Sequence, residues 1–290
     1  MVQDAQAICA NMTRLALPNV TLALVSDILV PECEAAISHS LALVDFGALF
    51  VGTSLPEQWH THPVTRIRRI ASAADYSDFV LRNLVGHIDT DYMLLIQWDG
   101  YVLSPRRWSA DFLAFDYIGA PWPQFADGDD VGNGGFSLRS HRLMMAMRDP
   151  AISLHHPEDV CIARTNRRQL EAKHGLRFAP AGLASRFSFE RSGEPAESFG
   201  FHGLFNFPLA MPQERAIAVI GNLPVAALTN RDGFDLAVRL ARSPTRSARR
   251  SARSIAWRRI LYRPFSLRSW RLLLSVIILH AAGRRLGSED

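Results

Sequence analysis

The chain has 290 residues, of which 48% are apolar and 21% charged, so its composition is that of a globular protein with an ample core. The net charge of +4 is unevenly distributed, because residues 239–290 carry thirteen arginines against Glu289 and Asp290. The tail is therefore +11 and residues 1–238 are −7. This asymmetry indicates that the tail, and not the body, meets anionic partners.

The cysteines exclude a disulfide framework or a structural zinc site. Cys9, Cys33 and Cys161 are odd in number, far apart and without Cys-x-x-Cys spacing, which favours a reducing compartment. Asp4 interrupts the N-terminus and no apolar segment follows, so we expect no signal peptide. No stretch reaches the roughly 18 apolar residues of a spanning helix. We therefore expect a cytoplasmic protein.

The first part of the chain alternates predicted strands with predicted helices. After a lead-in over residues 1–19, strands are predicted at 20–25, 46–51 and 92–97. Helices are predicted at 34–44 and 75–88, the second capped by Asp75, and residues 64–70 fit either type. This βαβ rhythm predicts an α/β fold with a mostly parallel central sheet flanked by helices.

The second part begins after Gly135. Here we predict a strand at 136–138, a helix starting within 140–147, a helix over 157–174 that Gly175 ends, and a short strand at 176–180. The composition shifts towards Arg, Ser and Ala at about residue 230. We therefore expect one domain over 20–230, followed by a basic helical tail over 231–290.

The stretch from Asp91 to Gly135 organises the chain. An apolar run ends at Asp99-Gly100, which is typical of a strand buried on both faces and followed by a turn. Open α/β sheets bind their ligands at the carboxyl ends of such strands, so Asp99 is the first candidate site residue. The alternative is that Asp-Gly is simply a turn.

Several motifs lie in and around this stretch, within about residues 20–210. They are Gln97-Trp-Asp-Gly-Tyr, Asp116-Tyr-Ile-Gly-Ala-Pro-Trp-Pro, Val131-Gly-Asn-Gly-Gly-Phe-Ser-Leu-Arg-Ser, Pro157-Glu-Asp-Val and Phe201-His-Gly-Leu-Phe-Asn. In these motifs the sequence resembles an uncharacterised family of bacterial and fungal proteins regarded as glycosyltransferase-like. That family is similar to the GT-A nucleotide-sugar fold.

The resemblance implies a glycosyltransferase that moves a sugar from a nucleotide-sugar donor to a glycan or lipid-linked acceptor, as in polysaccharide biosynthesis. GT-A enzymes usually carry an Asp-x-Asp that holds Mn²⁺ or Mg²⁺ on the sugar diphosphate. The matching tripeptide here is Gln97-Trp98-Asp99, which lacks the first carboxylate. The resemblance implies that Asp99 and His202 share the metal. The alternative is a non-catalytic nucleotide-sugar or carbohydrate-binding module that has lost part of the metal site.

The glycine-rich loop has two interpretations. Gly132-Asn-Gly-Gly135 has the composition of a hairpin turn, or its backbone approaches a sugar where side chains would interfere. Tyr101 joins the aromatic residues that could stack on a sugar, although we expect core packing for at least two of them. The predicted donor- and acceptor-binding residues are Gln97, Trp98, Gly100, Trp122, Asn133, Gly134, Gly135, Phe136 and Arg139.

Sugar transfer needs a base for the acceptor hydroxyl, and Asp159 is the first candidate, with Glu158 second. Both lie just inside the helix predicted to begin at Pro157. Acidic residues are also favoured there without any chemistry, because the helix dipole stabilises them. The same dipole is expected to lower the pKa of Asp159 and so weaken it as a base.

The tail ends in an apolar segment, 270–280, that is too short to span a bilayer and is flanked by arginines. Trp270 and the arginines are typical of a helix lying on an anionic membrane, here the inner face of the plasma membrane. The alternative is a C-terminal helix that packs back on the domain. We expect no nucleic-acid partner, because no recognised binding module surrounds the arginines.

Overall fold

Residues 14–285 are described by the structure, a computed structural model. The chain divides into two compact units at the peptide bond between His202 and Gly203. The N-terminal unit holds all the strands named here, and the C-terminal unit is built from helices.

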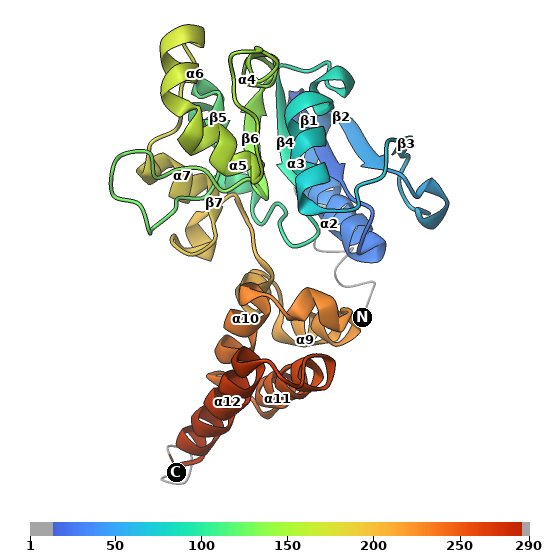
Figure 1. The fold of residues 1–290 in the computed structure, drawn as a ribbon, viewed down its shortest axis with the longest axis vertical. Coiled ribbons are helices and arrows are strands. Elements are labelled where there is room, and N and C mark those ends of the chain that lie inside the picture. Colours follow the sequence, from blue (N-terminus) through green and yellow to red (C-terminus); the bar gives the residue numbers. More distant parts are fainter. Residues whose placement is uncertain (1–13, 286–290) are drawn as a thin grey trace. The chain divides into compact units, whose positions relative to one another are not determined.

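A six-stranded sheet forms the centre of the N-terminal unit, with the strand order β3-β2-β1-β4-β6-β5 (Figure 1). The first three neighbouring pairs are parallel, and the pairs that involve β6 are antiparallel. The prediction of an α/β fold with a mostly parallel central sheet is confirmed. The strands are β1 (Leu15–Val25), β2 (Val44–Thr53), β3 (Thr65–Arg66), β4 (Tyr92–Ile96), β5 (Tyr117–Ile118) and β6 (Phe136–Ser140).

Strand β4 lies inside the sheet, between β1 and β6. Leu94 pairs with Leu22 on one side and with Leu138 on the other, and all three side chains are fully buried. The apolar run before Asp99 is therefore a strand buried on both faces, as predicted. Its position places Asp99 at the carboxyl edge of the sheet.

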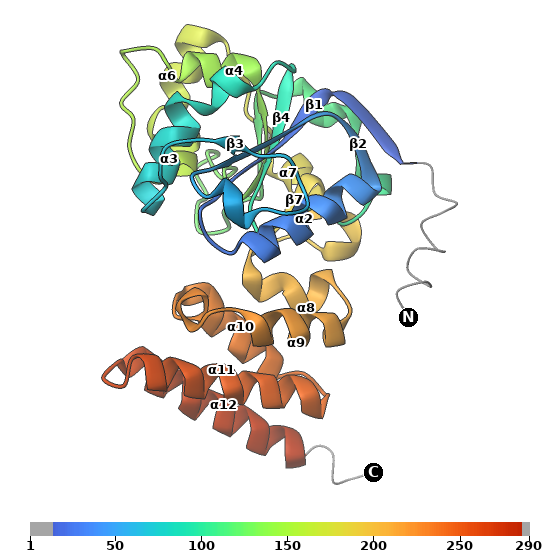
Figure 2. The same cartoon turned by 90° about the vertical axis from the view of Figure 1, so that its right-hand side faces the viewer.

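Helices cover the sheet because alternate strand residues point to opposite faces. Ala23 of β1 and Leu95 of β4 form one core cluster with Phe79 and Val80 of α3 (Ala73–Arg82). Helix α2 (Val30–Leu43), with Ile37 fully buried, lies on the other side of the strands (Figure 2). The remaining helices of this unit are α4 (His141–Ala146), α5 (Glu158–Val160), α6 (Arg167–His174) and α7 (Ala181–Phe187), and the short strands β7 (Ser188–Phe189) and β8 (Gly200–Phe201) pair with each other.

One predicted helix and one predicted strand need correction. The helix predicted at 75–88 begins two residues earlier, because Ser72 rather than Asp75 is its N-cap and accepts a hydrogen bond from the Asp75 N–H. It ends at Arg82, and a separate 3₁₀ turn follows over Leu84–His87. The strand predicted at 176–180 is reduced to one bridge between Phe178 and Tyr117.

The helix predicted over 157–174 is interrupted. Between α5 and α6 the chain makes a π-helical turn over Cys161–Thr165. The Cys161 carbonyl accepts from the Asn166 backbone N–H at 3.1 Å and from its side-chain amide at 2.9 Å, and the same amide donates to the Ser153 carbonyl at 3.0 Å. Gly175 ends α6 at φ 61°, as predicted.

The C-terminal unit contains α8 (Phe207–Ala210), α9 (Gln213–Asn222), α10 (Arg231–Ala241), α11 (Arg246–Tyr262) and α12 (Leu267–Arg285). Arg258 of α11 donates to the carbonyls of Ile220 and Gly221 at the end of α9. Residues before 230 thus pack with the arginine-rich helices, so the division at 202/203 lies earlier than the predicted boundary at about 230. Among the described residues, no helix is both long enough and apolar enough to cross a bilayer.

The contact between Gly119 and the glycine-rich loop yields a test of the fold. A Cβ on Gly119 would lie 2.1 Å from the Asn133 carbonyl oxygen, whereas one on Gly86 would meet nothing within 4 Å. Gly119→Ala should therefore lower the free energy of unfolding by about 3 kcal/mol, the upper end of the usual cost of overpacking. Gly86→Ala is the matched control and should change it by less than about 1 kcal/mol. Equal stability of the two variants in urea titrations would contradict this packing.

Candidate functional site

A cavity of about 420 Å³ opens where β1 and β4 end. Ser26 and Asp27 follow β1, Gln97 and Trp98 follow β4, and Tyr76 of α3 lies across from them in its lining. β2 and β3 lie on one side of β1 and β4 lies on the other, so the strand order reverses at this point. Crevices at such reversals are where open α/β sheets bind ligands.

Asp27 shapes the wall of this cavity. Its two carboxylate oxygens accept hydrogen bonds from Thr53 Oγ1 (2.9 Å), Ser54 N (2.6 Å), Ser54 Oγ (2.7 Å) and Ile70 N (2.7 Å). Burial alone would raise the pKa of Asp27, but these hydrogen bonds outweigh it and lower the pKa. Asp27 therefore ties the ends of β1 and β2 to the segment before α3.

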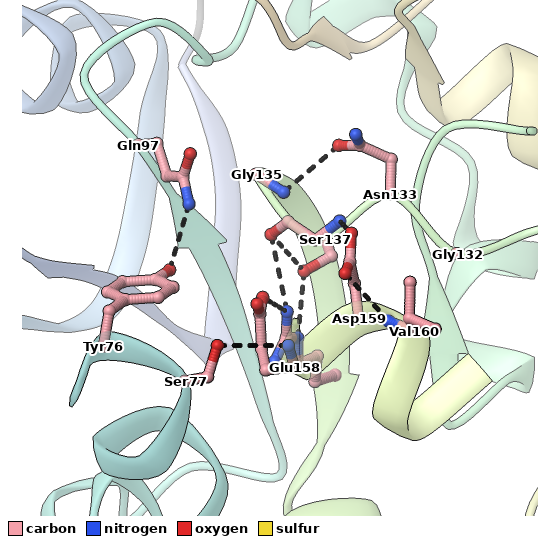
Figure 3. A network of polar contacts seen from close by, with 12 residues as sticks. Tyr76, Ser77, Gln97, Gly132, Asn133, Gly135, Ser137, Glu158, Asp159 and Val160 are labelled. Carbon is pink, nitrogen blue, oxygen red and sulfur yellow. Dashed lines mark hydrogen bonds and ion pairs between the residues drawn. The ribbon is translucent and has the colours of Figure 1, made fainter. Parts of the chain in front are cut away.

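Gln97 connects the cavity to a second cluster of polar groups. Its amide nitrogen donates to the Tyr76 hydroxyl at 3.3 Å, and its amide oxygen lies 3.2 Å from His202 Nε2. Figure 3 shows Gln97 and Tyr76 in contact beside the loop that carries Gly135. The residue that stands where a first metal-binding carboxylate was expected is thus hydrogen-bonded to a tyrosine and a histidine.

His202 lies between two carboxylates. Nε2 is 3.5 Å from Asp99 Oδ1, and Nδ1 is 3.6 Å from Glu190 Oε1. Burial alone would lower the pKa of His202, but the charges and hydrogen bonds of Asp99 and Glu190 outweigh it and raise the pKa well above its ordinary value. The two carboxylate neighbours therefore favour the protonated ring.

The predicted convergence of Asp99 and His202 is present, but the pair fits an ion pair better than a divalent-metal site. Two ligands of one ion can lie about 3–3.5 Å apart when each bond is about 2.1 Å, and the observed 3.5 Å agrees with this. Both ring nitrogens, however, already face protein groups, since Nε2 also lies 3.2 Å from Gln97 Oε1 and Nδ1 lies 3.6 Å from Glu190 Oε1. Within residues 14–285 no group of three or more His, Cys, Asp or Glu side chains is arranged to hold an ion.

The glycine-rich loop lies between this cluster and the acidic residues of α5. A Cβ on Gly135 would be 2.1 Å from His202 Nε2, and one on Gly134 would be 2.4 Å from Glu158 Oε1. On Gly132 it would lie 2.2 Å from the Trp122 ring. None of the three glycines has positive φ. The glycines thus make room for protein side chains, which neither the hairpin nor the sugar-approach interpretation required.

Glu158 forms a buried ion pair with Arg139. Arg139 Nη2 lies 3.0 Å from Glu158 Oε1, and the two side chains are 1% and 7% exposed. Arg139 also donates to Ser137 Oγ, and the Glu158 N–H donates to Ser77 Oγ at 3.2 Å. The Glu158 carboxylate is therefore held as a structural counter-charge (Figure 3).

Asp159 has a different environment. Its Oδ2 accepts from the Gly134 N–H at 3.2 Å and its Oδ1 from the Val160 N–H at 2.8 Å. Burial, followed by repulsion from Glu158, raises the pKa of Asp159 to about 6 although these hydrogen bonds oppose the shift. The expected lowering by the helix dipole is thus wrong in direction, because α5 spans only three residues and burial dominates.

The other predicted ligand-binding residues divide into cavity and core. Trp98 lines the cavity. Phe136 is fully buried among Phe187 and Phe199, and Trp122 packs against Phe125 with 7% of its surface exposed. Tyr101, Gly100 and Asn133 are also buried, and Asn133 Oδ1 accepts from the Gly135 N–H at 3.1 Å. Two or more of the aromatic candidates therefore pack in the core, as expected.

Sequence reasoning missed Glu190, Tyr76 and Asp27. Glu190 lies in a loop-rich stretch with no motif that sets it apart. Tyr76 falls within the helix predicted at 75–88, where nothing in the sequence distinguishes it from a core residue. Asp27 could have been predicted as a site residue, because it follows the first predicted strand as Asp99 follows the third.

One family match covers most of the candidate site. Residues 61–202 match the model of a family described as "Protein of unknown function (DUF5672)". The matched range contains the Gln97–Asp99 segment, the glycine-rich loop, the acidic pair and His202, and it stops where the N-terminal unit ends. No curated protein matches the chain.

The buried ion pair predicts a large stability effect. Arg139→Met leaves the Glu158 carboxylate buried without its partner, which typically costs about 3–5 kcal/mol of unfolding free energy. Adding Glu158→Gln should restore part of this loss, because the remaining side chain carries no charge. Chemical denaturation of the single and double variants measures both effects. A single variant within about 1 kcal/mol of the unaltered chain would show that the pair is not buried in solution.

Proposed function

We propose that the protein is a glycosyltransferase that moves a sugar from a nucleotide-sugar donor to a glycan or lipid-linked acceptor. The observation that carries this proposal is the cavity at the carboxyl ends of β1 and β4, together with the Asp159 carboxylate and its raised pKa. The motif resemblance to glycosyltransferase-like proteins with a GT-A-type fold supports the same conclusion.

The cavity is the proposed donor site. Its volume of about 420 Å³ falls within the range of small-molecule sites. Trp98 offers an aromatic surface, and Ser26 and Gln97 offer polar groups for a nucleotide or sugar. Tyr76 lines the same cavity, and the next residue, Ser77, accepts a hydrogen bond from the Glu158 N–H at 3.2 Å, so donor site and acidic pair adjoin.

Asp159 is the proposed general base. An acceptor hydroxyl would give its proton to the Asp159 carboxylate while its oxygen bonds to the anomeric carbon of the donor. The bond between that carbon and the diphosphate would break, and the diphosphate would leave with the electron pair. A pKa of about 6 makes Asp159 a stronger base than an ordinary aspartate and keeps it mostly ionised at neutral pH. Glu158 is the second candidate, but its carboxylate already neutralises Arg139.

The binding-module alternative rests on Gln97, which replaces a carboxylate with a neutral amide. Thermal shift with a panel of nucleotide sugars, with and without Mn²⁺, tests donor binding and the metal together. The ion pair between His202 and Asp99 predicts a shift that does not require Mn²⁺. Product formation from the same donors separates the two functions: an enzyme releases free nucleotide, and a binding module shows the shift alone.

The C-terminal unit is proposed to contact an anionic membrane surface, which would place the enzyme peripherally on the cytoplasmic face. Its arginines supply the charge, and several large apolar side chains of α11 and α12 are exposed, among them Trp257, Leu267 and Trp270. A membrane location suits a lipid-linked acceptor.

The assignment of the base predicts the effect of Asp159→Asn. This change keeps the shape of the side chain and removes its basicity, so kcat should fall by about 10²- to 10⁴-fold. Glu158→Gln is the matched variant. It should lower the free energy of unfolding, since it breaks the pair with Arg139, and should lower kcat much less than Asp159→Asn does. Full turnover by Asp159→Asn would refute the assignment.

The pKa of Asp159 also predicts the pH dependence of transfer. Only the ionised carboxylate accepts a proton, so kcat should rise with pH through about 6 and then level off. Asp159→Asn should lose this acid limb in its residual activity. A limb near the ordinary aspartate pKa of about 4 would mean that burial does not raise the pKa in solution.

A further inference from the structure

A second hollow lies within the C-terminal unit and is lined by four arginines. Its volume is about 390 Å³, and Arg231, Arg259, Arg268 and Arg271 line it together with Asp235. These residues come from α10, α11 and α12. Asp235 is the one acidic residue of the lining, and it lies 3.7 Å from Arg231. The hollow therefore has a clear excess of positive charge.

Arg259 is the unusual member of this group because it is 3% exposed. One guanidinium nitrogen donates to the carbonyls of Leu228 and Asn230, but Nε is buried without a hydrogen-bond partner. Burial and the charge of Arg263 lower the pKa of Arg259. A buried guanidinium normally has a carboxylate or another anion beside it. The described residues give Arg259, Arg268 and Arg271 no ion pair.

The start of α10 adds to the attraction for anions. Asn230 is its N-cap, with Oδ1 accepting from the Gly233 N–H at 2.9 Å, and Thr229 and Asn230 both line the hollow. The N-terminus of an 11-residue helix carries partial positive charge. The hollow thus combines a helix N-terminus with guanidinium groups, a combination that suits a phosphate.

Apolar side chains surround the arginines of α12. Phe265, in the turn between α11 and α12, is 98% exposed, and Leu267, Trp270 and Leu274 are 74%, 49% and 60% exposed. Leu267, Trp270 and Leu274 recur at helical spacing and form one stripe along α12. Arg268 and Arg271 lie on the same helix and are exposed while also lining the hollow. Phosphate-binding groups and a lipophilic stripe therefore lie on the same helix.

We propose that this hollow binds the phosphate of an anionic phospholipid headgroup while the α11–α12 turn and the apolar stripe of α12 enter the interfacial region of the bilayer. A free phosphate has the same charge chemistry, but the exposed apolar stripe favours the lipid. The inference extends the membrane contact proposed above. It does not depend on sugar transfer, because binding is measured without a donor.

The test compares two arginine pairs in the full-length protein. Arg268→Gln/Arg271→Gln removes two charges from the hollow, and Arg246→Gln/Arg250→Gln removes two exposed charges of α11 outside it. Co-sedimentation with vesicles of phosphatidylglycerol and phosphatidylcholine measures affinity. The first pair should weaken binding at least tenfold more than the second, although diffuse attraction contributes to both. Phe265→Ser/Leu267→Ser should weaken binding with all charges intact.

Three outcomes would overturn the proposal. Equal losses for both arginine pairs would show diffuse electrostatic attraction without a headgroup site. Full competition by millimolar inorganic phosphate, with no effect of Phe265→Ser/Leu267→Ser, would assign the hollow to a free phosphate. Tighter binding to an oligonucleotide than to vesicles, lost with the Arg268/Arg271 pair, would assign it to nucleic acid. Transfer activity persisting in any of these cases would leave the proposed enzymatic function intact.

Discussion

The candidate site depends on the missing side chains of Gly134 and Gly135. A Cβ at either position would overlap with His202 or Glu158, so the loop before β6 can pass only if both residues are glycine. The loop then lies between two charged groups. Asp99, His202 and Glu190 lie on one side, and Arg139, Glu158 and Asp159 on the other. One steric constraint therefore sets the spacing of both groups.

Burial acts on both groups, but the neighbouring charges decide the outcome. For His202, two carboxylates overcome the desolvation penalty and favour the charged ring. For Asp159, the nearby Glu158 carboxylate adds to the penalty and favours the neutral acid. Both residues therefore hold their protons more tightly than they would in water. A site with protonated histidine on one side and a titratable acid on the other is suited to proton transfer near neutral pH.

The sequence was sufficient for the sheet and for part of the site. The apolar run before Asp99 identified the buried strand, because a strand covered on both faces needs a continuous apolar segment. The convergence of Asp99 and His202 came from the motif resemblance, since residues that far apart in the chain carry no periodic signal. The partner of His202 on its other ring nitrogen, Glu190, could not be predicted for the same reason.

Two further features depended on tertiary contacts that no local pattern reports. At the break between α5 and α6 the Cys161 carbonyl accepts from both the backbone N–H and the side-chain amide of Asn166. The composition of the glycine-rich loop predicted a turn or a ligand-facing surface. In the structure these glycines instead leave room for side chains from distant segments of the chain. Local composition therefore predicted the position of the loop but not the residues that it contacts.

The use of arginine for nearly all basic positions has a consequence for regulation. Lys173 is the only lysine, and the charge of residues 239–285 comes from arginine. A guanidinium keeps its proton at any pH found in a cell, whereas histidine titrates in that range and lysine can when buried. The proposed attraction of the C-terminal helices for an anionic membrane is thus not expected to change with acidification. Ionic strength and the lipid composition of the surface remain as the variables that can tune it.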